Sequence, residues 1–142
     1  MGLSITKTEM YNRTLAFATR VAIMLKSVPK GYTEDNIGKQ LAKSSSSVGA
    51  NYREACHAKS PEDFASKLKI CEGEADETLY WLQLLANTDI IPEKRLRNLI
   101  QEARELVAIL TASTKTAYSR CRKKSDVQNL QTAIKIKVAP GK

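Results

Sequence analysis

Apolar side chains recur along most of the chain at steps of three and four residues, with polar side chains between them. This period is typical of amphipathic α-helices that bury one stripe. Four such segments follow one another, and short stretches of turn-forming residues separate them. Because long helices joined by short connections run in opposite directions, the pattern predicts an all-α, antiparallel, up-down-up-down four-helix bundle.

The first helix is predicted over about residues 8–27. Thr6 and Glu9 have the spacing of a capping box, and the sequence Pro29-Lys30-Gly31 supplies the stop. The stripe expected to face the core consists of Tyr11, Leu15, Ala18, Ala22 and Leu25.

The second helix is predicted over about residues 33–58, although four consecutive serines interrupt it at residues 44–47. Serine competes for backbone hydrogen bonds, so this run alone would also suit a flexible linker. The apolar period continues on both sides of the run and favours a helix. The residues that carry the period are Ile37, Leu41, Val48 and Ala55.

The third helix begins at Ser60-Pro61, because serine caps a helix and proline suits its first position. It ends at residues 87–89, and Pro92 begins a fourth helix that is predicted to reach about residue 124. The third core seam is Phe64, Leu68, Cys71, Ala75, Thr78, Leu82 and Leu85. The fourth is Leu96, Leu99, Ala103, Leu106, Leu110, Ser113 and Ala117, with Ile100 and Val107 in support.

The predicted division is therefore a bundle over residues 1–124 and a basic, mobile tail over 125–142, where the regular pattern ends and at most some residual helix remains. Several helices also carry apolar or small residues beyond one core stripe. Helices that are apolar on two faces usually bury both, so we expect a homo-oligomer, and a thick monomer core is the alternative. The expected interface residues are Phe17, Val21, Met24, Gly49, Tyr80, Trp81 and Leu84.

The net charge is +8, and much of the excess lies near the C-terminus. From Arg120 onward the chain has seven Lys or Arg residues and one acidic residue, Asp126. Such a distribution indicates phosphate binding without sequence specificity, and the alternative is that basic tails merely aid solubility. The expected nucleic-acid-binding residues are Lys115, Arg120, Arg122, Lys123 and Lys124, together with Arg13, Arg20, Lys39, Lys43 and Arg53.

Catalytic and metal chemistry have little support in the sequence. His57 is the only histidine, and it stands beside Cys56 near a predicted helix end without an orienting partner. Cys71 lies in a core seam, no Cys-x-x-Cys pair exists, and no glycine-rich phosphate loop is present. We therefore expect no enzyme activity, no metal and no cofactor. Three unpaired cysteines and no apolar run of about 20 residues indicate a cytoplasmic protein away from the membrane.

Short motifs in the second and third predicted helices resemble those of a known family. Residues 47–55, which read SVGANYREA, are followed by Asp63-Phe64, Lys67-Leu68, EADET at 74–78 and Tyr80-Trp81-Leu82. This arrangement resembles the four-helix-bundle proteins encoded in intervening sequences of 23S rRNA genes. The resemblance implies a left-handed bundle that assembles into a ring, commonly a pentamer, with no catalytic residues. It also implies kinship with accessory proteins of diversity-generating retroelements, which bind nucleic acid and partner a reverse transcriptase.

The polar residues of the resemblance have two interpretations. They either specify the bundle and its assembly, with acids of the third helix hydrogen-bonding the Asn51 amide, or they touch a ligand directly. The residues in question are Asn51, Glu54, Glu74, Asp76 and Glu77. The expected function is a non-catalytic homo-oligomer that binds RNA or DNA, and the alternative is a protein-interaction scaffold that docks a partner enzyme such as a reverse transcriptase.

Overall fold

The computed structural model describes residues 5–138, and four helices account for most of them. The helices are α1 (Lys7–Leu25), α2 (Tyr32–Cys56), α3 (Pro61–Asn87) and α4 (Glu93–Val138). Residues 5–138 contain no β-strand, so the all-α prediction of four helices is confirmed. Residues 139–142, the end of the predicted tail, lie outside the described range.

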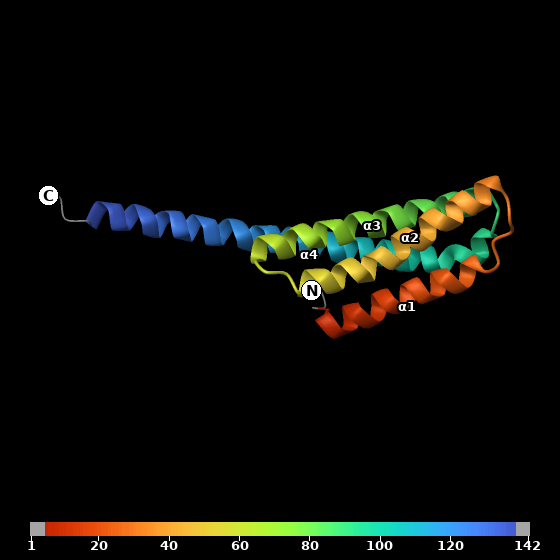
Figure 1. Cartoon of the computed structure of the whole chain (residues 1–142), viewed down its shortest axis with the longest axis horizontal. Helices are drawn as coiled ribbons and strands as arrows, with labels where there is room; N and C mark the ends of the chain where they lie inside the picture. The colour runs from red at the N-terminus through yellow and green to blue at the C-terminus, as the bar shows by residue number, and fades with distance from the viewer. Residues whose placement is uncertain (1–4, 139–142) are drawn as a thin grey trace.

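The helices lie side by side along one long axis (Figure 1). The α1–α2 and α3–α4 connections are at one end of the bundle, and the α2–α3 connection is at the other end, near the start of α1. α3 packs extensively against both α2 and α4, whereas α1 packs mainly on α2 and contacts α4 far less. The α1–α4 side is therefore the least closed side of the bundle.

Side chains at the helix starts form the predicted caps. The Thr6 hydroxyl accepts a hydrogen bond from the Glu9 amide at 3.1 Å, and the Glu9 carboxylate accepts one from the Thr6 amide at 2.6 Å. At α3, the Ser60 hydroxyl accepts from the Asp63 amide at 3.0 Å, and Pro61 is the first helical residue. Both caps satisfy amides that have no partner inside the helix, so the ends of α1 and α3 are fixed by local chemistry.

The serine run at residues 44–47 is helical, and the prediction of an uninterrupted α2 is confirmed. Each serine hydroxyl donates to a carbonyl three or four residues earlier in the same helix. Ser44 and Ser45 are buried, and their small volume allows neighbouring helices to approach closely. The hydroxyls thus meet their hydrogen-bonding needs without a partner from another helix.

The predicted seams of α3 and α4 form most of the core. Every predicted α3 position is buried except Phe64, which is half-buried, and in α4 only Ser113 and Val107 are half-buried. Thr114 is buried beside Ser113. Leu and Ile side chains with almost no exposed surface each stabilise the fold by about 1.5–3 kcal/mol.

The predicted core stripe of α1 is wrong. Phe17, Val21 and Met24, which were expected at an oligomer interface, are buried in the core together with Met10 and Thr14. Leu15 and Ile23 are instead 57% and 60% exposed. The two stripes have the same steps of four and three residues and are offset by one position, so helical periodicity alone does not choose between them. Because they are buried, Phe17, Val21 and Met24 are not available to a second copy.

The regular pattern was predicted to end after residue 124, with at most some residual helix beyond it, whereas α4 continues unbroken to Val138. The side chains of residues 122–137 are all exposed, so this part of the helix projects beyond the bundle (Figure 1). We call residues 122–138 the α4 extension. No proline or glycine occurs in it, and Pro140-Gly141 comes only after its end, so nothing in the sequence stops the helix earlier.

Gly49 packs inside the protomer, which corrects its predicted place at an oligomer interface. A methyl group at Gly49 would lie 2.9 Å from Thr14 Oγ1 and 3.1 Å from Thr14 Cβ, whereas one at Gly73 would meet nothing within 4 Å. Thr14 is buried, and its hydroxyl donates to the Met10 carbonyl at 2.7 Å, so it has little freedom to move.

We expect Gly49→Ala to lower the free energy of unfolding by about 1–3 kcal/mol, because overpacking outweighs the better helix propensity of alanine. The matched change Gly73→Ala should raise it by about 0.5–1 kcal/mol, since only the propensity acts there. Urea unfolding followed by circular dichroism measures both. Equal effects at the two glycines would contradict close packing of α1 on α2.

Candidate nucleic-acid interface

A hollow of about 570 Å³ lies where α4 passes the α2–α3 connection. Three basic side chains line it: Lys59 from the connection, and Arg120 and Lys124 from α4. The two α4 residues are four positions apart and share one face of the helix. We call this feature the basic hollow. Its remaining lining residues are Ala55, Cys56, Ala58, Ser60, Pro61, Phe64 and Ala117.

The electrostatics of the basic hollow favour an anion. None of its three basic side chains forms an ion pair within residues 5–138, and all three are exposed. The nearby Asp63 carboxylate is already engaged, because it accepts from the Lys59 amide at 3.2 Å and pairs with Lys67 Nζ at 3.4 Å. The hollow also adjoins the N-terminus of α3, where the helix dipole is positive. Phosphate oxygens are the ligands that suit such a site.

The structure divides the other predicted basic residues of α4. Lys115, Arg122 and Lys123 are exposed as expected. A helix turns by about 100° per residue, so Lys115 and Arg122 share a face that points away from Arg120 and Lys124. The five α4 residues therefore surround the helix and do not form one patch.

The basic residues of α1 and α2 are spread along the bundle. Arg20 and Lys39 lie in the half near the α1–α2 connection, and Lys43 lies near the middle of α2. Arg53 lies at the end near the basic hollow, where its guanidinium stands 4.7 Å from the centre of the Tyr11 ring. Only Arg53 of this group is positioned to extend the basic surface at that end.

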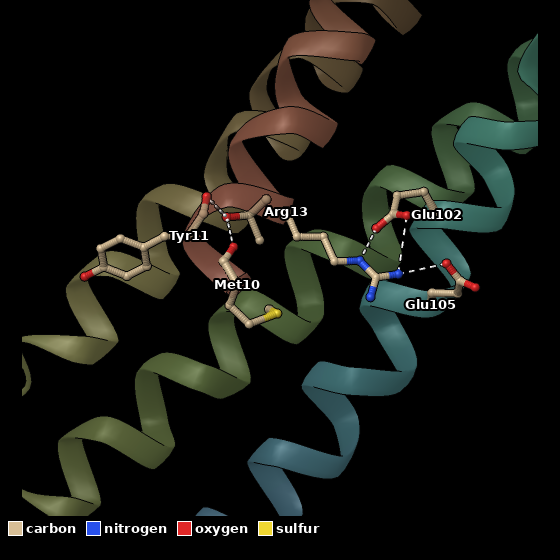
Figure 2. A network of polar contacts seen from close by, with 6 residues as sticks. Met10, Tyr11, Arg13, Glu102 and Glu105 are labelled. Atoms are coloured by element: carbon tan, nitrogen blue, oxygen red, sulfur yellow. Dashed lines mark hydrogen bonds and ion pairs between the residues drawn. The ribbon is translucent and has the colours of Figure 1, made fainter. Parts of the chain in front are cut away.

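Arg13 holds α1 to α4 and is not free to bind phosphate. Figure 2 shows its guanidinium between two carboxylates of α4. Nε lies 2.6 Å from Glu102 Oε1, and one terminal nitrogen lies 2.8 Å from Glu105 Oε2. The hydrogen bond to Glu102 raises the pKa of Arg13 above its ordinary value. The predicted binding role of Arg13 is therefore replaced by a structural one.

The polar residues of the family-like motif bond mainly within their own helices. The Asn51 amide donates to the Ser47 carbonyl of α2 at 2.8 Å, so the predicted bond from α3 acids is not formed. Glu77 accepts from the Trp81 indole at 3.2 Å. Burial raises the pKa of Glu74, as does the neighbouring Glu77, while Lys43 acts in the opposite direction. Glu54 and Asp76 are exposed.

Of the predicted interface residues on α3, Tyr80 is the one that stays exposed, at 56%. Its ring meets Trp81 edge to face, with 5.0 Å between the ring centres. Trp81 and Leu84 are half-buried and pack against the core of the protomer. Tyr80 is thus the part of the predicted α3 surface that a second molecule can reach.

Reactive groups are few in the described part of the chain. Burial raises the pKa of the Cys71 thiol to about 12, which keeps it protonated and unreactive. Burial also raises the pKa of Tyr52, with the Cys56 thiol contributing. Residues 5–138 contain no cluster of three or more His, Cys, Asp or Glu side chains arranged for a metal ion. Over the same range, no helix combines the length and apolar character needed to cross a bilayer.

Sequence reasoning missed Lys59, although a signal for it existed. Lys59 directly precedes Ser60, which caps α3. The sequence alone therefore placed a basic side chain beside the start of a helix. Arg120 and Lys124 were predicted, but their approach to Lys59 depends on how far α4 runs past the α2–α3 connection.

Comparison with known proteins shows similarity over the bundle. The profile of the family described as 23S rRNA-intervening sequence protein matches residues 6–112. A solved structure from Bacteroides thetaiotaomicron VPI-5482, described as a protein with unknown function from the S23 ribosomal protein family, is similar with 35% sequence identity and a TM-score of 0.69. The match covers 75% of this chain and 98% of that chain. None of the curated proteins compared with the chain matches it.

Replacing Arg13 with Met should lower the free energy of unfolding by about 1 kcal/mol, because the partly buried Glu102 loses its partner. The control is Arg97→Met, which breaks a fully exposed pair with Glu93 in one helix and should have no measurable effect. Urea unfolding at low and high salt measures both changes. An Arg13 variant as stable as the parent at low salt would contradict the role of this ion pair in joining α1 to α4.

Proposed function

The chain belongs to the 23S rRNA-intervening sequence protein family, and from this premise we propose that it is a cytoplasmic, non-catalytic protein that binds RNA or DNA through the basic hollow. One observation carries the proposal. Lys59, Arg120 and Lys124, which come from two separate segments, line the same hollow without acidic partners among the described residues.

The chemistry of this site matches a nucleic-acid backbone. Each Lys or Arg that neutralises a phosphate releases bound counterions, which favours binding in a salt-dependent way. Pro61 has no N–H and the Asp63 amide is bonded to the Ser60 hydroxyl, so α3 contributes mainly the positive end of its helix dipole beside the three side chains. Because none of these groups reads a base edge, binding should be largely independent of sequence. Arg53 and the basic residues around the α4 extension can add further phosphate contacts.

Assembly would strengthen such binding. We propose an antiparallel bundle that forms a homo-oligomer, and the family resemblance suggests a pentameric ring. Tyr80 of α3 and the exposed Leu15 and Ile23 of α1 offer apolar surface for contacts between copies. Several basic hollows in one particle would act together, so a weak single site becomes a strong multivalent one.

The alternative is a protein scaffold or accessory subunit that docks a partner enzyme. The kinship with retroelement accessory proteins, which partner a reverse transcriptase, is the reason to consider it. It predicts that the protein binds its partner in the absence of nucleic acid and that the basic hollow contributes little.

A triple variant in which Lys59, Arg120 and Lys124 are each changed to Gln should bind duplex DNA and structured RNA more weakly. If each side chain makes one phosphate contact, the slope of log affinity against log salt should fall by about two to three units. The matched control replaces Arg20, Lys26 and Lys39, which removes the same charge from exposed positions nearer the opposite end of the bundle. Fluorescence anisotropy over a range of salt concentrations measures both variants.

The control separates a located site from general basicity. If both triple variants lose affinity equally, net charge drives binding and the basic hollow is not the site. If the parent binds neither RNA nor DNA at low salt, the nucleic-acid proposal fails and the scaffold takes its place. Unchanged circular dichroism spectra of both variants show that the bundle is intact.

A further inference from the structure

The α4 extension carries an apolar stripe that nothing in the protomer covers. Val127, Leu130 and Ile134 are 53%, 63% and 53% exposed. Their spacing of three and four residues places them on one face of the helix. The segment continues a packed helix but has no tertiary packing of its own, so covering the stripe with a partner would stabilise it.

A groove lies beside α4 on the open α1–α4 side of the bundle. Its volume is about 1040 Å³. We call it the α1–α4 groove. Small side chains of α4 form much of it, among them Ala108, Ala112 and Thr116, with Ile109 between them and Phe64 of α3 at one end. The charged side chains of Glu9, Arg13, Glu105 and Arg120 line it as well. The small and apolar part of such a groove can receive the large side chains of another helix.

The stripe and the groove lie on the same line along α4. Five helical turns contain about 18 residues, and this is the separation between Val127 and Ile109. The same separation relates Leu130 to Ala112. Ile134 and Thr116 are related in the same way. One face of α4 thus presents small side chains in its bundle half and large apolar side chains in the extension.

We propose that two copies of the chain pair through this face of α4, with the helices antiparallel about a two-fold axis near residue 121. In this register Leu130 of one copy meets Ala112 of the other, and Ile134 meets Ile109. Val127 likewise meets Thr116. Each extension then fills the groove of the other copy, and the interface is closed by its own symmetry.

Charge acts in two opposite ways in this register. Glu105 lines the α1–α4 groove, where it already pairs with Arg13, and the antiparallel register places Lys137 of the second copy opposite it as a second cation. Near the axis, Arg120 of each copy faces Lys123 of the other, so four positive charges come together. Added salt screens this repulsion, so pairing should strengthen as salt rises. Phosphate binding, in contrast, weakens as salt rises. The pairing does not depend on the proposed function.

A disulfide scan tests the register directly. The double variant Thr116→Cys/Val127→Cys is made in a background with Cys56→Ser and Cys121→Ser. Within one chain the two new cysteines are about 16 Å apart along the helix axis, too far for a disulfide. In the proposed pair each faces its counterpart on the second copy. Mild oxidation should therefore give a covalent dimer of the double variant, while each single variant stays a monomer on a denaturing gel.

A second measurement uses a matched pair of substitutions. Leu130→Gln removes a side chain from the centre of the stripe, whereas Ile136→Gln changes an equally apolar side chain, 72% exposed, on the opposite face of the same helix. Sedimentation equilibrium should show that Leu130→Gln weakens pairing through α4 by at least about a hundredfold, since two buried leucines are lost per dimer, while contacts between copies through Tyr80, Leu15 and Ile23 are unaffected. Ile136→Gln should leave association unchanged.

Three results would overturn the proposal: no cross-linked dimer from the double variant, cross-linking of a single variant to the same extent, or equal effects of Leu130→Gln and Ile136→Gln. Arg120 lines both the basic hollow and the α1–α4 groove, so the pairing is tested only with the cysteine, Leu130 and Ile136 variants, all of which keep Arg120. The two proposals can therefore fail independently.

Discussion

The packing of α3 between α2 and α4 is the constraint on which the rest of the structure depends. The α3 seam buries Leu68, Leu82 and Leu85 almost completely, and it combines them with the small residues Ala65 and Ala75. Alternating large and small side chains let two helices approach the same helix from different sides. This packing fixes the position of α4, and with it the positions of the basic hollow and the α4 extension.

α1 is held differently. It packs closely on α2, where Gly49 receives Thr14, but it reaches α4 mainly through the Arg13 guanidinium and its two carboxylates. An ion pair at a partly exposed site stabilises less than a continuous apolar contact would. The result is a bundle with three well-packed sides and one open side. The open side leaves the α1–α4 groove accessible.

The end of the bundle near the α2–α3 connection concentrates positive charge for structural reasons. α3 begins at this end, so the positive end of its helix dipole lies here. α4 passes the same end of the bundle before it continues into the extension. The α2–α3 connection places Lys59 at the hollow, and α4 places Arg120 and Lys124 there. Basic residues elsewhere on the bundle do not have this arrangement, because Arg13 is neutralised and Arg20 and Lys39 lie nearer the other end.

The sequence by itself determined the number of helices, the caps at Thr6 and Ser60, the seams of α3 and α4 and the basic character of the C-terminal region. These features follow from local hydrogen bonding, from the regular apolar spacing along α3 and α4, and from composition. Only the tertiary structure decided which of two stripes on α1 is buried, that Gly49 packs inside the protomer, and which basic side chains meet. Helical periodicity predicts which residues share a face of a helix, but not which other helix packs against that face. That choice depends on contacts between segments far apart in the chain, and those contacts exist only once all four helices have packed.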